Sequence, residues 1–183
     1  MAIGRAERHS VSQKRGGTFV GLGTNLPHAG LAGPALLRAA VKGLFSTGLM
    51  AVRCSSIWET APWPPSDQAP FCNAVVELDR ACLGPQSLFE RFLEIERAFG
   101  RERREHWGPR TLDLDLLDVE GLVGSFGPIT LPHKRVHERA FALAPLAELG
   151  WRHPVLGATA AELLAGLPSG QVVARMEGNL SPF

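Results

Sequence analysis

Hydrophobic residues along the chain recur at two spacings, which predict an alternation of strands and helices. Leu37, Val41 and Leu44 recur every three or four residues and predict a helix over about 31–47. Pro85 and Gly100 have positions typical of the start and the end of a second helix. Apolar runs predict strands at about 18–22, 50–58, 71–79, 111–117 and 129–131, and helical patterns lie near 140–149 and 158–167.

The order β-α-β-β-α-β is typical of one known arrangement of these elements. It predicts the α+β class, with a ferredoxin-like split βαβ antiparallel sheet and helices packed on one face. A chain of 183 residues has room for a single domain, which we place at 18–183. Residues 1–17 show no apolar period, so we expect a disordered N-terminal extension there.

Composition and charge argue against several function classes. Residues 18–183 have a net charge of −2, against +3 in residues 1–17, whereas a general nucleic-acid binder would carry a strongly basic domain. The uncharged stretch 16–37 contains prolines, Asn25 and His28, so it is not a membrane helix, and no signal peptide is expected. Three cysteines without metal-like spacing suit reduced thiols. We therefore expect a cytoplasmic protein that binds neither nucleic acid nor membrane.

Two carboxylates on the strand at 111–117 are the strongest indication of chemistry. Asp113 and Asp115 share one face of that strand, with Cα atoms about 6.6 Å apart, and leucines take the other face. Magnesium favours one or two carboxylates together with substrate phosphates. Because leucines rather than a basic residue flank each aspartate, we expect metal ligands rather than structural residues. A strand with a solvated acidic face would show the same pattern, so the hexapeptide alone leaves both interpretations open.

The loop before this strand supplies arginines that suit phosphate groups. Arg101, Arg103, Arg104 and Arg110 fall within ten residues, and guanidinium groups bind phosphate oxygens in pairs. A charged loop neutralised by its own glutamates is the ordinary alternative. Because Arg110 leads directly into the carboxylate strand, the two segments together favour phosphoryl transfer. The sequence contains no glycine-rich loop ending in Gly-Lys-Ser/Thr, so arginines and metal would have to hold ATP.

Two further places carry candidate polar chemistry. Phe71 and Asn73 share a strand face, where a ring can stack on a flat heterocycle and a carboxamide can pair with its polar edge. For Phe71 alone, a place in the core is the commoner outcome. His133 and His137 lie four residues apart, but a zinc site there would lack an obvious third ligand. His133 is better suited to a phosphate contact.

Taken in order, these motifs resemble the 6-hydroxymethyl-7,8-dihydropterin pyrophosphokinase family. The resemblance covers roughly residues 18–165 and is most specific at Trp107-Gly108-Pro109-Arg110-Thr111-Leu112-Asp113-Leu114-Asp115. It rests also on Gly21-Leu22-Gly23-Thr24-Asn25-Leu26, Glu59-Thr60-Ala61-Pro62 with Asp67-Gln68, Phe71-Cys72-Asn73, and Leu131-Pro132-His133 with Arg139 and Phe141. Leu93 and Lys134 stand where the family often has a glutamine and a tyrosine.

The resemblance implies a folate-pathway enzyme with a ferredoxin-like fold. It would transfer the terminal diphosphate of ATP, its co-substrate, to the hydroxymethyl group of the dihydropterin and release AMP. Asp113 and Asp115 would bind two Mg²⁺ ions and act catalytically with Arg101 and Arg110. The pterin would contact Thr60, Ala61, Trp63, Phe71, Asn73, Trp107 and Phe141. ATP would contact Glu96, Arg103, Trp107, Arg110, Leu116, Thr130, His133 and Arg139. We expect a monomer whose partners are these small molecules.

Two rivals from other classes share parts of this pattern. An RNA-recognition module has the same βαββαβ order, but it would expose several aromatic side chains on its central strands, where Phe71 is nearly alone. A metal-dependent nucleotidyltransferase with a ferredoxin-like palm would also use Asp113 and Asp115. It would need a polymer-binding region, for which 183 residues leave little room.

Overall fold

The computed structural model describes residues 17–63, 65–79, 83–101 and 108–180. In chain order, its elements are β1 (Thr18–Thr24), α1 (Gly33–Ser46), β2 (Ala51–Cys54), β3 (Ser56–Thr60), β4 (Phe71–Leu78), α2 (Pro85–Ala98), β5 (Asp113–Val119), β6 (Gly124–Phe126), β7 (Ile129–Leu131), the 3₁₀ helix η1 (Val136–Glu138), α3 (Ala140–Glu148), α4 (Ala160–Ala165) and β8 (Val173–Asn179). Apart from Gly17, the extension expected at 1–17 lies outside the described residues and stays a prediction.

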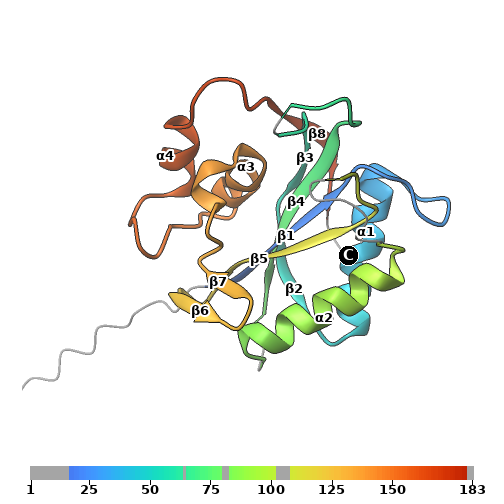
Figure 1. Ribbon diagram of the computed structural model, residues 1–183, viewed down its shortest axis with the longest axis horizontal. Coiled ribbons are helices and arrows are strands. Elements are labelled where there is room, and N and C mark those ends of the chain that lie inside the picture. Colours follow the sequence, from blue (N-terminus) through green and yellow to red (C-terminus); the bar gives the residue numbers. More distant parts are fainter. Residues whose placement is uncertain (1–16, 64, 80–82, 102–107, 181–183) are drawn as a thin grey trace, which may run out of the picture.

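The main sheet is antiparallel and has the order β5-β1-β4-β3-β8, with β2 also paired to β4 (Figure 1). β4 lies between β1 and β3, the strands on either side of α1 in the chain. In the same way, β1 lies between β4 and β5, which α2 connects. These two interleaved units confirm the predicted α+β class and the split βαβ arrangement.

One predicted strand is divided in two. The extended run at 50–58 becomes β2 and β3, which separate at Ser55. The buried Ser55 hydroxyl accepts a hydrogen bond from the Val75 backbone N–H at 2.9 Å and donates to the Ser56 carbonyl at 2.7 Å. The side chain therefore satisfies backbone groups at the point where the ladder between the two strands and β4 is interrupted.

Helices cover both faces of the sheet, which corrects the expectation that they would pack on one face. α1 and α2 lie against one face, and α3, itself covered by α4, lies against the other (Figure 1). The central strands are apolar on both sides: Val20 and Val76 face the first layer, whereas Phe19 and Val75 face the second. A sheet buried on both faces needs such nearly continuous apolar runs rather than a strict alternation.

β6 and β8 are not predicted by the hydrophobic pattern. β6 forms a small separate sheet with β7, and β8 pairs with β3 along one edge of the main sheet. Both are short or largely exposed, so their sequences carry no strong apolar period. Within the described ranges, no helix is long and apolar enough to cross a membrane.

Candidate functional site

A cavity of about 280 Å³ opens on the α3 side of the sheet, where β1 and β3 end and β4 and β5 begin, beside the start of α3. Six residues that sequence analysis assigned to the pterin line it: Thr60, Ala61, Trp63, Phe71, Asn73 and Phe141. The seventh, Trp107, lies outside the described residues. The structure therefore brings together side chains from three separate parts of the sequence around one hollow.

The polar wall of this cavity is fixed by a side-chain hydrogen bond between two strands. The Asn73 Nδ2 group donates to the Thr60 hydroxyl at 2.8 Å, and both side chains are buried. Gly23 on β1 lies in register with Asn73 on one side and with Asp113 on the other. A Cβ at residue 23 would lie only 3.0 Å from the Asn73 Oδ1 atom. Glycine at this position therefore leaves room between the carboxamide and the carboxylate.

Aromatic side chains form the apolar part of the same wall. Phe71 and Phe141 are half-buried, and Trp63 is exposed. The Arg139 guanidinium lies 5.4 Å from the centre of the Phe141 ring, within the range of a cation–π contact. Apolar rings beside a buried carboxamide can enclose a flat heterocycle that carries hydrogen-bonding groups along one edge.

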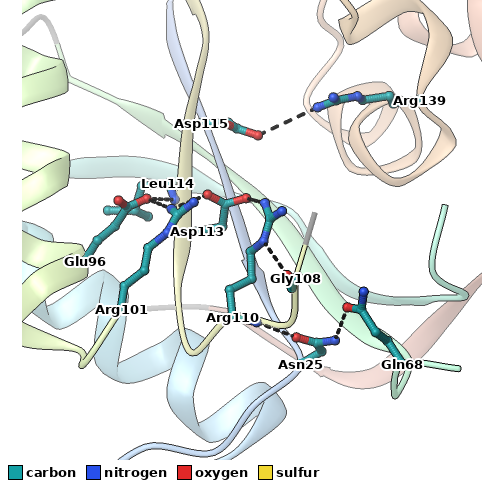
Figure 2. A network of polar contacts seen from close by, with 10 residues as sticks. All are labelled: Asn25, Gln68, Glu96, Arg101, Gly108, Arg110, Asp113, Leu114, Asp115 and Arg139. Atoms are coloured by element: carbon teal, nitrogen blue, oxygen red, sulfur yellow. Dashed lines mark hydrogen bonds and ion pairs between the residues drawn. The ribbon is translucent and has the colours of Figure 1, made fainter. Parts of the chain in front are cut away.

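Asp113 lies at the centre of a network of ion pairs at the cavity rim (Figure 2). Arg101 Nη1 contacts both Asp113 Oδ1 and Glu96 Oε1, and Arg110 Nη1 contacts Asp113 Oδ2. The expectation that Asp113 would have no basic partner is therefore wrong. Its partners, Arg101 and Arg110, come from the two ends of the segment between α2 and β5 rather than from the flanking positions of the strand.

Both arginines of this network are held in turn by other groups. The buried Glu96 carboxylate accepts the Leu114 backbone N–H at 2.8 Å, so Arg101 is anchored to α2 and β5 together. The backbone N–H of Arg110 donates to Asn25 Oδ1 at 2.8 Å, and the Asn25 amide donates to Gln68 Oε1 at 3.2 Å. Glu96 therefore holds Arg101 in place and does not line either substrate-sized cavity.

Asp115 lies two residues further along β5 and faces the same cavity. Its Oδ2 atom is 3.9 Å from Arg139 Nη1, and this contact is drawn in Figure 2. Desolvation in the cavity wall and the neighbouring Asp113 carboxylate raise the pKa of Asp115 to about 7, against the opposing effect of nearby arginines. Negative charge on Asp115 is thus poorly compensated, in contrast to that on Asp113.

A second cavity, of about 190 Å³, lies on the other side of Asp115. Leu116, Thr130 and His133, three of the residues assigned to ATP, line it together with Lys134. Burial lowers the pKa of His133 to about 4, so its imidazole is neutral at physiological pH. Asp115 lines both cavities. It marks the place where molecules bound in the two hollows would meet.

The remaining sequence-predicted residues are placed as follows. Arg110 and Arg139 line the larger cavity rather than the smaller one. Arg103 lies outside the described residues, as does Trp107. His137 packs edge-on against His153, with 5.8 Å between the ring centres, and does not accompany His133 into the smaller cavity.

Two cavity-lining residues, Arg135 and Gln68, carried no role in the sequence analysis. Arg135 pairs with Glu138 at 2.9 Å on the rim. Its place in a basic run that starts directly after His133 is the feature that could have indicated it. Gln68 lies between β3 and β4, and its contact with Asn25 spans 43 residues, which no local pattern reports.

Comparisons with known proteins agree with this geometry. Residues 19–150 match the family model for 7,8-dihydro-6-hydroxymethylpterin-pyrophosphokinase. A 2-amino-4-hydroxy-6-hydroxymethyldihydropteridine pyrophosphokinase of Methylorubrum extorquens is 43% identical over 154 residues, which cover 83% of this chain and 94% of the relative. Proteins of the same name from Synechocystis and Bacillus subtilis are each 39% identical, over 81% and 72% of this chain and 74% and 76% of their own lengths.

Proposed function

The chain belongs to the 7,8-dihydro-6-hydroxymethylpterin-pyrophosphokinase family, and from that premise we propose that its two cavities hold the two substrates of this reaction. The enzyme transfers the terminal diphosphate of ATP to the hydroxymethyl group of 6-hydroxymethyl-7,8-dihydropterin and releases AMP, in folate synthesis. The observation that carries the assignment is that Asp115 lines both cavities.

The larger cavity is the pterin site in this proposal. Phe71 and Phe141 enclose the ring, and the Asn73 carboxamide, held by Thr60, pairs with its polar edge. The hydroxymethyl group then points toward β5. Its oxygen attacks the β-phosphorus of ATP, the bond from that phosphorus to the oxygen shared with the α-phosphate breaks, and the hydroxyl proton passes to solvent.

The smaller cavity accepts the nucleotide, with its phosphates directed toward Asp115. Arg101, Arg110 and Arg139 then surround the diphosphate while they remain near the two aspartates. A guanidinium carries five N–H donors, so each arginine can bind a carboxylate and a phosphate oxygen together. The neutral His133 imidazole adds a hydrogen-bonding contact without adding charge.

Asp113 and Asp115 fit a magnesium site shared with substrate. Among the described residues, no three His, Cys, Asp or Glu side chains converge as a complete metal cage. Two carboxylates that face one cavity match the usual protein share of Mg²⁺ ligands, with ATP phosphates supplying others. We propose that these two residues hold two ions, which would neutralise charge on the diphosphate and the departing AMP. The poorly compensated charge of Asp115 supports this assignment.

The reaction is tested by identifying the nucleotide that forms from ATP with and without 6-hydroxymethyl-7,8-dihydropterin. AMP that appears only when the pterin is present supports the proposal. A nucleotidyltransferase would instead transfer AMP to its own acceptor and release free diphosphate without any need for pterin, and an RNA-binding protein would form neither product.

Asn73→Ala is expected to weaken pterin binding and leave ATP binding nearly unchanged. Removal of the buried carboxamide leaves the polar edge of the heterocycle without its partner, which costs on the order of 1–3 kcal/mol. Isothermal titration of wild type and variant with each ligand separately measures both effects. If ATP were the ligand that bound more weakly, the pterin site would be misplaced.

The assembly state and compartment extend the proposal. We also infer a monomeric, cytoplasmic enzyme, in which Cys54 and Cys72 are free thiols as in a reducing compartment. Burial raises the pKa of the Cys54 thiol to about 11. Burial and the nearby Glu59 carboxylate raise the pKa of the Cys72 thiol, so both thiols react slowly near neutral pH.

A further inference from the structure

Gln171 makes a two-point contact with the backbone on both sides of Arg139. Its Oε1 atom accepts the backbone N–H of Ala140 at 2.9 Å, and its Nε2 group donates to the carbonyl of Glu138 at 2.8 Å. Gln171 lies just before β8 and outside the residues matched by the family model, 19–150. One carboxamide therefore fixes the two peptide groups that flank a residue of the larger cavity.

The contact replaces a helix cap that the local sequence does not supply. Arg139 occupies the N-cap position of α3, with an extended backbone at φ −121° and ψ 108°. Serine, threonine, aspartate and asparagine are the usual side chains at such a position, because they accept the first N–H groups of the helix. Here Gln171 accepts the N–H of Ala140 from another part of the chain. The Arg139 side chain extends instead toward Asp115 and Phe141.

The segment that carries Gln171, residues 170–173, also contacts the wall of the larger cavity that is formed by β3. Val173, at the start of β8, is the register partner of Thr60 on β3. Residues 170–173 line a small hollow with Trp63 and Phe141, directly behind the larger cavity. Residues 170–173 therefore link the strand that carries Thr60 to the helix start that carries Arg139 and Phe141.

We propose that Gln171 is a positioning residue for pterin binding and diphosphate transfer, acting through Arg139 and Phe141. The inference rests on the proposed function, because it assigns those two side chains to the substrates. Gln171 lines neither of the two cavities assigned to the substrates. Its carboxamide sets the direction of the backbone at residues 138–140, and hence where the guanidinium and the ring lie. Small displacements of such groups have large effects on rate, since the reacting atoms need close alignment.

A positioning role for Gln171 can be distinguished from simple helix capping, because water can replace the hydrogen bonds of its side chain. The contacts of Gln171 are partly open to solvent, so water molecules can pair with Ala140 N–H and Glu138 C=O once the side chain is shortened. Water satisfies those two backbone groups but does not link them to residue 171. Loss of this link should therefore change pterin binding and turnover more strongly than the stability of the fold.

The test compares Gln171→Ala with Gln171→Glu, which keeps an acceptor for Ala140 and loses the donor to Glu138. For Gln171→Ala we expect the Kd of 6-hydroxymethyl-7,8-dihydropterin to rise and kcat to fall, each by about tenfold, and Tm to fall by about 2–4 °C. Gln171→Glu should lie between Gln171→Ala and wild type. Gln86→Ala, an exposed glutamine of α2 outside both cavities, is the matched control and should behave as wild type.

A double-mutant cycle with Phe141→Ala decides whether Gln171 acts through that ring. If it does, Gln171→Ala should change pterin Kd by less than twofold in the Phe141→Ala background. Equal effects in both backgrounds, or a folded Gln171→Ala protein with wild-type Kd and kcat and only a lower Tm, would overturn the inference while the pterin site stands. If Phe141→Ala itself binds the pterin normally, the pterin site is wrong and the inference fails with it.

Discussion

Asp115→Asn is expected to lower turnover by about a hundredfold or more without destabilising the metal-free protein. The substitution keeps the size of the side chain and removes the negative charge that would bind Mg²⁺ beside the diphosphate. Loss of one key electrostatic stabiliser of a transition state typically costs this much. The fold should not suffer, because the Asp115 carboxylate is desolvated and lies 3.9 Å from its nearest cationic partner, Arg139.

The stability part of this prediction depends on pH in a defined direction. The pKa of Asp115 is raised to about 7 in the folded protein, whereas an unfolded aspartate titrates near its usual value of about 4. Between these two values the folded state keeps a proton that the unfolded state has lost. The contribution of Asp115 to wild-type stability therefore falls as pH rises from about 4 to 7 in metal-free buffer. The asparagine variant should lack this contribution, so the difference in Tm between the variant and wild type should shift in favour of the variant as pH rises from about 4 to 7.

Asp113→Asn is the matched comparison, and it should behave differently. Asp113 neutralises Arg101 and Arg110, so its loss should lower Tm as well as turnover. Thermal melts in EDTA and AMP-release assays on both variants give the four values required. An Asp115→Asn protein that melts well below wild type, yet keeps wild-type activity per folded molecule, would make Asp115 a structural residue and exclude it as a metal ligand.

Arg110→Lys should reduce turnover at least tenfold and change Tm much less. Lysine preserves the positive charge but loses the planar pair of donors that can bind Asp113 and a phosphate oxygen together. The backbone N–H of residue 110 would still donate to Asn25, so the loop keeps its anchor. Steady-state kinetics with saturating ATP and pterin measure the effect on kcat.

Arg91→Lys on the exposed face of α2 is the control for this substitution, and its activity should equal that of wild type. Arg110→Lys with full activity would mean that charge alone suffices at this position. The planar pair of guanidinium donors would then have no part in binding the transferred diphosphate.

Much of the fold follows from local patterns in the sequence. The helix at 33–46 and the one that starts at Pro85 were predicted from apolar spacing and from proline and glycine at their ends. Local patterns did not reveal that Ser55 divides one strand or that β8 completes the sheet edge. Both depend on partners distant in the chain, Val75 for Ser55 and β3 for β8. The helices near 140–149 and 158–167 were predicted, but their place on the second face of the sheet was not, although the nearly continuous apolar runs of the central strands are typical of a sheet covered on both faces.

The candidate site likewise has features that follow from local sequence patterns and features that depend on contacts between distant parts of the chain. That Asp113 and Asp115 share a face follows from the period of a strand, and the structure places both on the larger cavity. The ion pair of Asp113 with Arg101 could not be predicted, since Arg101 reaches it from the loop after α2 and is itself held by Glu96 of that helix. Gln171 is further removed still, 31 residues from the Ala140 N–H that it accepts. Contacts of this kind are set by tertiary packing and leave no periodic trace in the sequence.

The central claim is that a pterin-bound hydroxyl attacks the β-phosphorus of ATP, and two ATP analogues test it most directly. In α,β-methylene-ATP a carbon replaces the oxygen at the bond that must break, whereas β,γ-methylene-ATP keeps that bond. With 6-hydroxymethyl-7,8-dihydropterin and Mg²⁺ present, the account predicts AMP from ATP and, more slowly, from β,γ-methylene-ATP, and no cleavage of α,β-methylene-ATP. Omission of the pterin should abolish AMP in every case. Pterin-dependent release of ADP from ATP would contradict the account, because it would place the attack on the γ-phosphorus instead.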